Sequence, residues 1–373
     1  QISDKWCSTS GIYLTNGILK DIRKQRIYIT STFMVNFYKL SLSQKLSTGN
    51  NLPCSEQKGD YYMKLVFLDA KTIGDDLDLS QFDQFGEVVK YSFSTPEEVP
   101  GRVLDADVII VNKILINEAS IGTAKKLKLV CVTATGTNNL DKEYLDKRGI
   151  AWRNVAGYST ESVAQHTFAM LFYLLEHLRY YDDYVKNDHY TNDTIFTHFE
   201  KTFYELKGKT WGIIGLGNIG RRVASIANAF GANVIYSSPS GAAPQEGFHQ
   251  VSLDLLLETA DIVSVHAPLN KYTENLIDFS AFRKMKKSAI FLNLGRGPIV
   301  VEKDLKRALE TDEIRAAGLD VLSEEPMCTD NPLRGFSDSN RLLITPHIAW
   351  ASIEARTKLM NIIAEQIKEF FSL

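Results

Sequence analysis

Cysteine is scarce in this 373-residue sequence, and its four copies stand far apart, at Cys7, Cys54, Cys131 and Cys328. No two of them form a C-x-x-C pair and none has the spacing of metal ligands, so we expect neither a disulfide framework nor a bound metal. Long hydrophobic runs are also missing. The best candidate, residues 168–175, is much shorter than the roughly 20 apolar residues of a membrane span. These absences predict a cytoplasmic protein with reduced thiols and no membrane partner.

A large charge of either sign is missing as well. The formal net charge is −3, hydrophobic residues make up 44% of the chain, and charged residues make up 23%. These values are ordinary for a soluble globular protein, and they give no argument for nucleic acid or an anionic membrane as a partner. A chain of this length has room for two domains with buried cores.

The stretch that indicates the fold most clearly is 210–230, TWGIIGLGNIGRRVASIANAF. It opens with apolar, β-favouring residues and closes with apolar residues at helical spacing, which predicts strand, turn and helix in that order. Gly215, Gly217 and Gly220 form G-x-G-x-x-G in the turn, the fingerprint of a dinucleotide site. The pyrophosphate of the dinucleotide is expected on the N-terminus of the helix. The alternative is a tight strand-to-helix turn that binds no ligand.

From Met63 onward, strand and helix patterns alternate along the chain, which predicts an α/β protein built from two doubly wound domains. A long helix is expected over 162–181, between the two domains, and an amphipathic helix over 352–371 at the end of the chain. Residues 1–62 do not share this alternation, because basic, partly apolar and polar turn-rich segments follow one another there. We predict that residues 1–62 are a poorly ordered extension, and upstream sequence translated in error is one origin for it.

Three polar side chains follow predicted strands of the second domain, namely Arg296, Glu325 and His347. Ligands of doubly wound sheets lie beyond the carboxyl ends of the strands, so we expect these side chains to converge there. Arginine offers two parallel donors to a carboxylate, histidine can donate a proton near neutral pH, and a carboxylate beside the histidine fixes its orientation. This set suits hydride transfer to a 2-keto acid, although each residue alone is equally compatible with an ordinary structural position.

Five motifs then appear in a characteristic order: GLGNIGR, HAPLN, MKKSAIFLNLGRG, GLDVLSEEP and TPHIAWAS. Together with TATGTNN and NVAGYSTESVAQHT in the first half, they make the sequence from Met63 to the C-terminus similar to the D-isomer-specific 2-hydroxyacid dehydrogenases. The resemblance implies a Rossmann NAD(P)-binding domain, residues 161–348, inserted in a flavodoxin-like substrate domain, residues 63–160 and 349–373.

The same resemblance implies roles for individual residues. Arg296 binds the carboxylate and carbonyl of the substrate, His347 is the acid–base residue, and Glu325 is its partner. The implied cofactor site comprises Gly215, Gly217, Asn218, Ile219, Gly220, Ser238, Ala267, Leu294, Gly295, Arg296 and Asp320.

The first domain is expected to close over the substrate. Asn112, Lys113 and Gly136 fall where backbone N–H groups of the family hold the substrate carboxylate, and ordinary loop chemistry is the alternative. Trp350 is expected to form an aromatic wall of the site or else to lie at a domain interface. Three other histidines are expected to be structural: His166, His177 and His266.

One position departs from the family pattern. An acidic residue normally ends the second strand of the cofactor domain and binds the ribose hydroxyls of NAD, but Ser238 stands there in VIYSSPSG. NADP is therefore not excluded, yet no arginine follows in SPSGAAP to hold its additional phosphate. We expect NAD as the cofactor.

We predict an oxidoreductase that transfers a hydride between NAD(P)H and a small 2-hydroxy acid, with hydroxypyruvate and D-glycerate as the first candidates. D-lactate or another D-2-hydroxy acid is an alternative substrate, and a non-catalytic NAD(H)-sensing protein of the same fold is an alternative function. Formate dehydrogenases fit poorly, because they have glutamine where Glu325 stands. The aromatic segment 180–204 lies where relatives build a dimer arm, so a homodimer is expected.

Overall fold

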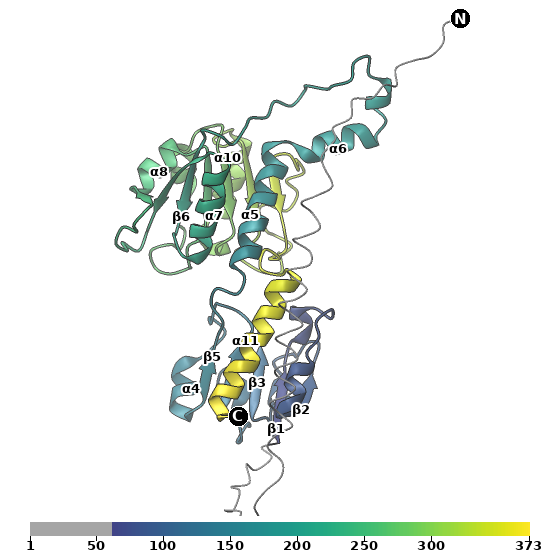
Figure 1. Cartoon of the computed structure of the whole chain (residues 1–373), viewed down its shortest axis with the longest axis vertical. Helices are drawn as coiled ribbons and strands as arrows, with labels where there is room; N and C mark the ends of the chain where they lie inside the picture. Colours follow the sequence, from purple (N-terminus) through teal and green to yellow (C-terminus); the bar gives the residue numbers. More distant parts are fainter. Residues whose placement is uncertain (1–61) are drawn as a thin grey trace, which may run out of the picture. The chain divides into compact units, whose positions relative to one another are not determined.

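The computed structural model describes residues 62–373 (Figure 1). The predicted poorly ordered extension, residues 1–62, lies outside the described residues except for Tyr62. Within the described part, no helix is long and apolar enough to cross a membrane. Two parallel sheets with their helices form this part, which confirms the predicted α/β class.

The first sheet has five parallel strands in the order β2-β1-β3-β4-β5. Its strands are β1 (Met63–Phe67), β2 (Gly86–Lys90), β3 (Val108–Val111), β4 (Leu129–Val132) and β5 (Ala151–Arg153). This is the flavodoxin-like order. The three central strands are almost completely buried, as expected where both faces of a parallel sheet are covered. The connections contain η1 (Ala70–Ile73), η2 (Ser80–Phe85), α2 (Val99–Arg102), α3 (Glu118–Ile121) and α4 (Lys142–Arg148).

The second sheet has seven parallel strands in the order β12-β11-β10-β9-β6-β7-β8. Its strands are β6 (Thr210–Ile214), β7 (Asn233–Ser237), β8 (His249–Gln250), β9 (Ile262–Val265), β10 (Ile290–Asn293), β11 (Ala316–Leu319) and β12 (Leu342–Ile344). The chain runs outward from β6 in one direction through β7 and in the other through β9. That reversal is the place where a Rossmann fold binds its dinucleotide.

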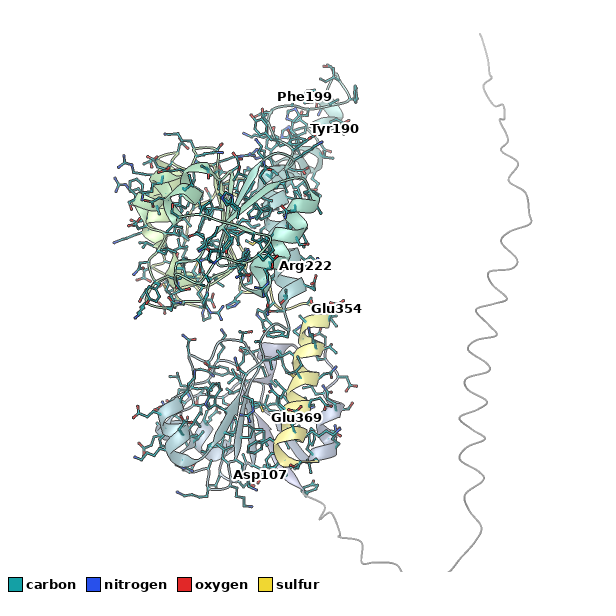
Figure 2. The ribbon with its side chains drawn as sticks, turned by 60° about the vertical axis from the view of Figure 1, so that its left-hand side comes forward. Asp107, Tyr190, Phe199, Arg222, Glu354 and Glu369 are labelled. Carbon is teal, nitrogen blue, oxygen red and sulfur yellow. The ribbon has the colours of Figure 1, made fainter. Side chains whose placement is uncertain are left out.

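The helices of the second sheet include one break that the sequence pattern did not predict. They are α5 (Thr160–Leu175), α6 (Leu178–Lys186), η3 (Tyr190–Asn192), α7 (Asn218–Ala229), α8 (Leu253–Thr259), α9 (Phe279–Lys284), η4 (Gly297–Ile299) and α10 (Glu302–Glu310). The expected single helix over 162–181 is wrong, because His177 adopts a left-handed backbone with φ of 54°. α6 then buries none of its side chains, and Tyr190 and Phe199 lie on the exposed segment that follows it (Figure 2).

The final helix, α11 (Ile353–Phe371), packs on the first sheet rather than the second. Its buried residues Leu359, Met360 and Ile363 belong to the same hydrophobic cluster as Met63 and Leu65 of β1. Hydrophobic residues from the two ends of the described chain therefore share one core.

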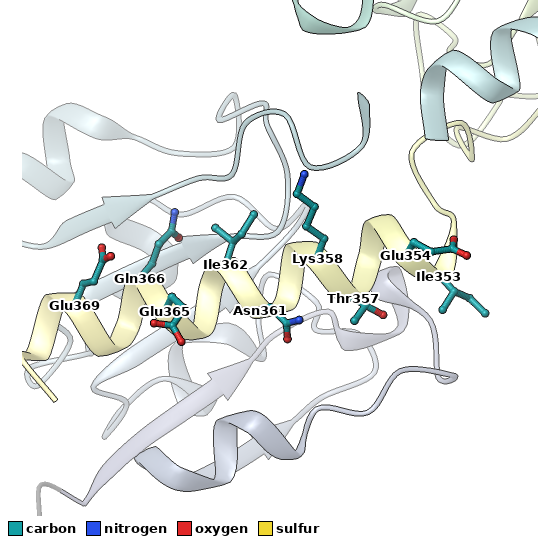
Figure 3. Close-up of a pocket in the computed structure, with 9 residues that line it drawn as sticks. All are labelled: Ile353, Glu354, Thr357, Lys358, Asn361, Ile362, Glu365, Gln366 and Glu369. Carbon is teal, nitrogen blue, oxygen red and sulfur yellow. The ribbon is translucent and has the colours of Figure 1, made fainter. Parts of the chain in front are cut away.

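The outer face of α11 carries a groove of about 730 Å³. Figure 3 shows its nine lining residues, all of which belong to this helix: Ile353, Glu354, Thr357, Lys358, Asn361, Ile362, Glu365, Gln366 and Glu369. None of them is among the residues that the sequence predicts for the substrate or the cofactor.

Candidate active site

The glycine turn follows β6 and needs glycine at two positions for different reasons. Gly215 has φ of 92°, and a Cβ atom there would lie 2.7 Å from the backbone of Ala267 on the neighbouring strand end. A Cβ atom at Gly220 would lie 2.3 Å from the carbonyl oxygen of Gly215, so this glycine lets α7 pack directly on the turn. Side chains at these positions would force the strand, turn and helix apart.

Gly217 differs from the other two glycines because its missing side chain faces open space. Apart from the adjacent chain, no heavy atom of residues 62–373 comes within 4 Å of a Cβ atom placed there. Gly217 also precedes α7 without a side-chain hydrogen bond to cap the helix. The first N–H groups of α7 are thus available to an anion, and their partial positive charge attracts one. These features fit the pyrophosphate of NAD or NADP.

Several predicted cofactor residues surround this turn. Ala267 and Leu294 are buried at the ends of β9 and β10, and a Cβ atom at Gly295 would lie 2.9 Å from the carbonyl oxygen of Ala267. Ile219 packs against the hydrophobic cluster beneath α7. The structure therefore brings these four residues to the carboxyl ends of adjacent strands.

At the expected ribose end of the cofactor site, Gln245 contributes in addition to the predicted Ser238. Ser238 follows β7 directly, as predicted. From the loop that comes next, the Gln245 side chain accepts a hydrogen bond from Arg221 (3.0 Å) and donates one to the carbonyl oxygen of Leu216 (2.9 Å). Arg221 also donates to the side chain of Asn218 over 2.6 Å. Gln245 thus ties the loop after β7 to the glycine turn, and nothing in the sequence pattern pointed to it.

Glu325 and His347 form a direct pair. Nδ1 of His347 lies 2.7 Å from Oε2 of Glu325, while the other carboxylate oxygen accepts the N–H of Leu322 at 3.0 Å. An ionised carboxylate can only accept, so Nδ1 of the histidine carries the shared hydrogen. This arrangement leaves Nε2 of His347 directed away from Glu325.

The pKa of the Glu325 carboxyl group lies below its ordinary value of 4.5. Burial is the largest single influence and raises this pKa, but the groups around the carboxylate together lower it by more, and the hydrogen bond and charge of His347 are the main ones. The N–H of Leu322 and the positive charge of Lys113 act in the same direction as His347. The carboxylate is therefore ionised throughout the neutral pH range.

The backbone around His347 is held by a buried carboxylate. Asp320, which directly follows β11, is only 2% exposed. It accepts hydrogen bonds from the hydroxyl of Thr345 (2.6 Å) and from the N–H groups of Ile348 and Ala349 (both 2.9 Å). His347 has φ of 54° and donates its own N–H to the carbonyl oxygen of Asp320. Asp320 thereby fixes the turn that presents the histidine, and its predicted contact with the cofactor stays a prediction.

Two residues of α5 support the same turn. Nε2 of His166 lies 3.1 Å from the hydroxyl of Thr345 and 3.7 Å from Oδ1 of Asp320. The hydroxyl of Ser162 donates to the carbonyl oxygen of Ala349 over 2.6 Å. Sequence reasoning missed the participation of Thr345 and Ser162, although Thr345 belongs to the motif TPHIAWAS.

Arg296 follows β10 at the same edge of the sheet. Its guanidinium donates to the carbonyl oxygen of Gly295 over 2.8 Å, and its own carbonyl oxygen accepts from Asn293. Gly297, the next residue, touches the backbone of Leu322 so closely that any side chain there would collide. This contact holds the Arg296 loop against the segment that leads to Glu325.

Two loops of the first sheet contain the residues that the sequence predicts for substrate binding. A Cβ atom at Gly136 would lie 2.9 Å from Nη2 of Arg296, so the loop that carries Gly136 lies close to the end of the Arg296 side chain. The N–H groups of Asn112 (2.9 Å) and Lys113 (2.7 Å) donate to the carboxylate of Asp69. Because both N–H groups are occupied, binding of a substrate carboxylate by them would require this turn to change. Lys113 stays a candidate for binding the substrate carboxylate, because its side chain is exposed.

Trp350 packs against the cluster around α5 as well as the cluster around α11, and its ring meets that of Tyr158 edge to face. These contacts favour the alternative in which Trp350 is an interface residue over the preferred one in which it forms a wall of the site.

A family model described as the NAD binding domain of D-isomer specific 2-hydroxyacid dehydrogenases matches residues 168–349. The hydroxypyruvate reductase of Blautia hydrogenotrophica is 36% identical over 316 residues, which cover 83% of this chain and 97% of that protein. The chain belongs to the D-isomer-specific 2-hydroxyacid dehydrogenases. The glycine turn and the strand-end residues described above are thus parts of a 2-hydroxyacid dehydrogenase.

Two further proteins are similar to this dehydrogenase over nearly their whole length. The glycerate dehydrogenase of Methylorubrum extorquens is 34% identical over 305 residues, covering 82% of this chain and 93% of that protein. The structure of D-lactate dehydrogenase from Aquifex aeolicus, complexed with NAD and lactic acid, matches with a TM-score of 0.69 and 27% identity. That match covers 83% of this chain and 95% of the other. The chain is therefore an NAD(P)-dependent oxidoreductase.

The low pKa of Glu325 predicts how this residue contributes to stability at different pH values. A carboxyl group with a depressed pKa stabilises the folded state fully above its unfolded pKa, and this contribution is lost as the pH falls through the folded value. We expect Glu325→Gln to lower the free energy of unfolding near neutral pH and to have a shrinking effect below about pH 4.5. Urea denaturation of both proteins across this range measures the difference.

The same experiment can test whether His347 lowers the pKa of the Glu325 carboxyl group. In a His347→Gln background, Glu325→Gln is expected to have a smaller effect, because the main favourable partner of the carboxylate is gone. If wild type and Glu325→Gln lose stability in parallel as the pH falls, the carboxyl group does not have a depressed pKa.

Proposed function

We propose that this dehydrogenase reduces hydroxypyruvate to D-glycerate. The observation that carries the proposal is the pair of Glu325 and His347, 2.7 Å apart, at the sheet edge that also bears Arg296. The names of two relatives, a hydroxypyruvate reductase and a glycerate dehydrogenase, support the choice of substrate. Reduction of pyruvate to D-lactate is the second candidate, supported by the similar D-lactate dehydrogenase structure.

In the proposed reaction, Arg296 binds the carboxylate of the keto acid, and its charge polarises the neighbouring carbonyl group. Bound NADH supplies the hydride that reduces C2. His347 in its protonated form donates a proton from Nε2 to the carbonyl oxygen, so the C=O bond becomes C–OH. Glu325 stabilises the charged imidazole before this transfer and orients it. The neutral histidine then regains a proton from solvent, and the reverse reaction uses the same groups in the opposite order.

The proposed cofactor is NAD rather than NADP. The segment 238–248 that follows β7 contains no lysine or arginine that could hold a 2′-phosphate. Arg221 contacts this segment through Gln245, but it is engaged with Gln245, Leu216 and Asn218. Ser238 can accept or donate a hydrogen bond to a ribose hydroxyl, although it lacks the charge of the usual acid.

The proposed assembly is a homodimer formed through the segment after α6. Large apolar side chains are exposed there, including Phe196 at 87% and Phe199 at 80%. Tyr184 and His198 stack on each other, so the segment returns to α6 and yet leaves these phenylalanines uncovered. Apolar patches of this kind mark protein interfaces, and closed symmetric dimers are the commonest oligomers.

We further propose that residues 63–160 and 349–373 form the substrate domain and residues 161–348 the cofactor domain. The packing of α11 on the first sheet supports the discontinuous substrate domain. The proposed compartment is the cytoplasm, where the free thiols of Cys131 and Cys328 are stable.

The proposed role of His347 as the proton donor can be tested by substitution. We expect NADH-dependent turnover of hydroxypyruvate, and His347→Gln is expected to lower kcat by about 10²- to 10⁴-fold because a general acid is lost. Steady-state kinetics on hydroxypyruvate, glyoxylate and pyruvate measure turnover and rank the substrates. NADH binding by the variant, measured by fluorescence, is the control and should be unchanged. NADH binding by the wild type without turnover of any keto acid would instead support a sensor.

The proposed preference for NAD can be tested with both cofactors. We expect kcat/KM with NADH to exceed that with NADPH by at least about tenfold. This is the effect of lacking one charge-assisted hydrogen bond from a lysine or arginine to the 2′-phosphate of NADPH. Ser238→Asp should widen this ratio by repelling the 2′-phosphate, whereas Ser238→Arg should narrow it. A wild-type preference for NADPH would contradict the assignment.

The proposed homodimer can be tested in solution. Sedimentation velocity is expected to show a dimer, and Phe196→Ser combined with Phe199→Ser should shift it towards monomer. A matched control is Phe93→Ser, since Phe93 is also exposed but lies in the loop between β2 and α2. A wild-type monomer at micromolar concentration would be incompatible with the proposed dimer.

A further inference from the structure

A hollow of about 610 Å³ lies at the opposite end of the strands that lead to Arg296, Asp320 and His347. Its walls include Lys287, just before β10, the segment 312–315 before β11 and the segment 338–341 before β12. These are the amino ends of the same three parallel strands. A strand of four residues spans about 13 Å, so the hollow is separate from the candidate active site.

The charge of this hollow is positive, although the chain as a whole carries a net charge of −3. Four cationic side chains and two carboxylates line it: Lys201, Lys287, Arg315, Arg341, Asp312 and Asp338. The two carboxylates balance only half of the positive charge. We call these six residues and the hollow between them the basic pocket.

Arg315 is the half-buried cation of the basic pocket. One of its nitrogens donates to the carbonyl oxygen of Leu175 (3.0 Å) and lies 2.6 Å from Nε2 of His177. No carboxylate of residues 62–373 forms an ion pair with it. Burial lowers the pKa of Arg315, which reflects the cost of keeping this charge away from water. Buried charges in proteins are normally paired.

One polar atom at the wall of the pocket is also unsatisfied. Oδ1 of Asn340 is buried and has no hydrogen-bond partner among the described residues, whereas the backbone of Thr202 is a partner of the buried His177 ring. His177 in addition holds the left-handed backbone that breaks the helix between α5 and α6. Unsatisfied polar atoms and unusual backbone conformations together are more typical of ligand sites than of structural surfaces.

The remaining cations differ in the contacts that they already make. Arg341 donates to the carbonyl oxygens of Arg315 and Ile314, and its guanidinium forms an ion pair of 3.0 Å with the exposed carboxylate of Asp312. The exposed Lys287 forms no ion pair within residues 62–373. An anion in the pocket would therefore meet one half-buried guanidinium and one uncommitted ammonium group.

We propose that the basic pocket binds a phosphate group, carried either by inorganic phosphate or by a phosphomonoester. A phosphate dianion matches the uncompensated charge, and its oxygens can accept from Arg315 and Lys287 together. A phosphomonoester also fits by size, because the volume lies within the range of about 300–1,000 Å³ that small-molecule sites occupy.

Isothermal titration calorimetry of the full chain with inorganic phosphate tests the proposal. The protein is first saturated with NADH, so that the glycine turn is occupied, and ionic strength is held constant with sodium chloride. We expect phosphate to bind, and we expect Lys287→Gln to weaken the binding by about tenfold through loss of a charge-assisted hydrogen bond. Lys303→Gln is the matched control, because Lys303 is an exposed lysine of α10 outside the pocket, and it should leave the affinity unchanged.

A second variant and a second ligand complete the test. Arg315→Gln should abolish the binding, and circular dichroism establishes that this variant is folded. Glycerol 2-phosphate in place of inorganic phosphate distinguishes the two sources: tighter binding of the ester identifies a phosphomonoester, and weaker binding identifies the free ion. Absence of phosphate binding, or equal affinities for Lys287→Gln and Lys303→Gln, overturns the proposal.

Discussion

The carboxylate of Asp320 is the group on which the geometry of the site depends. It is ionisable and almost completely buried, and it accepts three hydrogen bonds from the short segment that contains His347. Burial of a carboxylate is costly unless its oxygens are satisfied, so this segment has little freedom to leave it. The left-handed backbone of His347 and the direction of its ring follow from that constraint. The position of His347, and with it the hydrogen bond to Glu325, therefore depends on Asp320 at the end of β11.

The parts of the fold that follow local rules could be predicted from the sequence. The glycine turn was recognisable because each glycine meets a separate steric requirement, and the structure shows close approaches at Gly215 and Gly220. The placement of Arg296, Glu325 and His347 at one sheet edge also follows, since parallel strands share an edge. The break at His177 was not predictable in this way, because the surrounding sequence is compatible with a continuous helix. Gln245, Thr345 and Ser162 act through side chains from distant segments, and no local pattern marks such pairings.

The second sheet is used differently at its two ends. At the carboxyl ends of β10, β11 and β12, charged groups are satisfied by near neighbours, as the pair of Glu325 and His347 shows. At the amino ends of the same strands, Arg315 has no acidic partner in the described part of the chain. Three short strands of three or four residues connect these ends. A shift of one strand along its axis would displace residues at both of its ends, because close-packed strands transmit displacement.

The packing of α11 on β1 has a consequence for the order of events during synthesis. The core beneath the first sheet contains Met63 and Leu65 as well as Leu359 and Ile363, so it lacks one wall until α11 has left the ribosome. The second sheet is built from a continuous stretch of chain and has no such dependence. The later part of the sequence can therefore fold first, while the earlier strands wait with one apolar face uncovered. That interval is when this protein depends most on protection from aggregation.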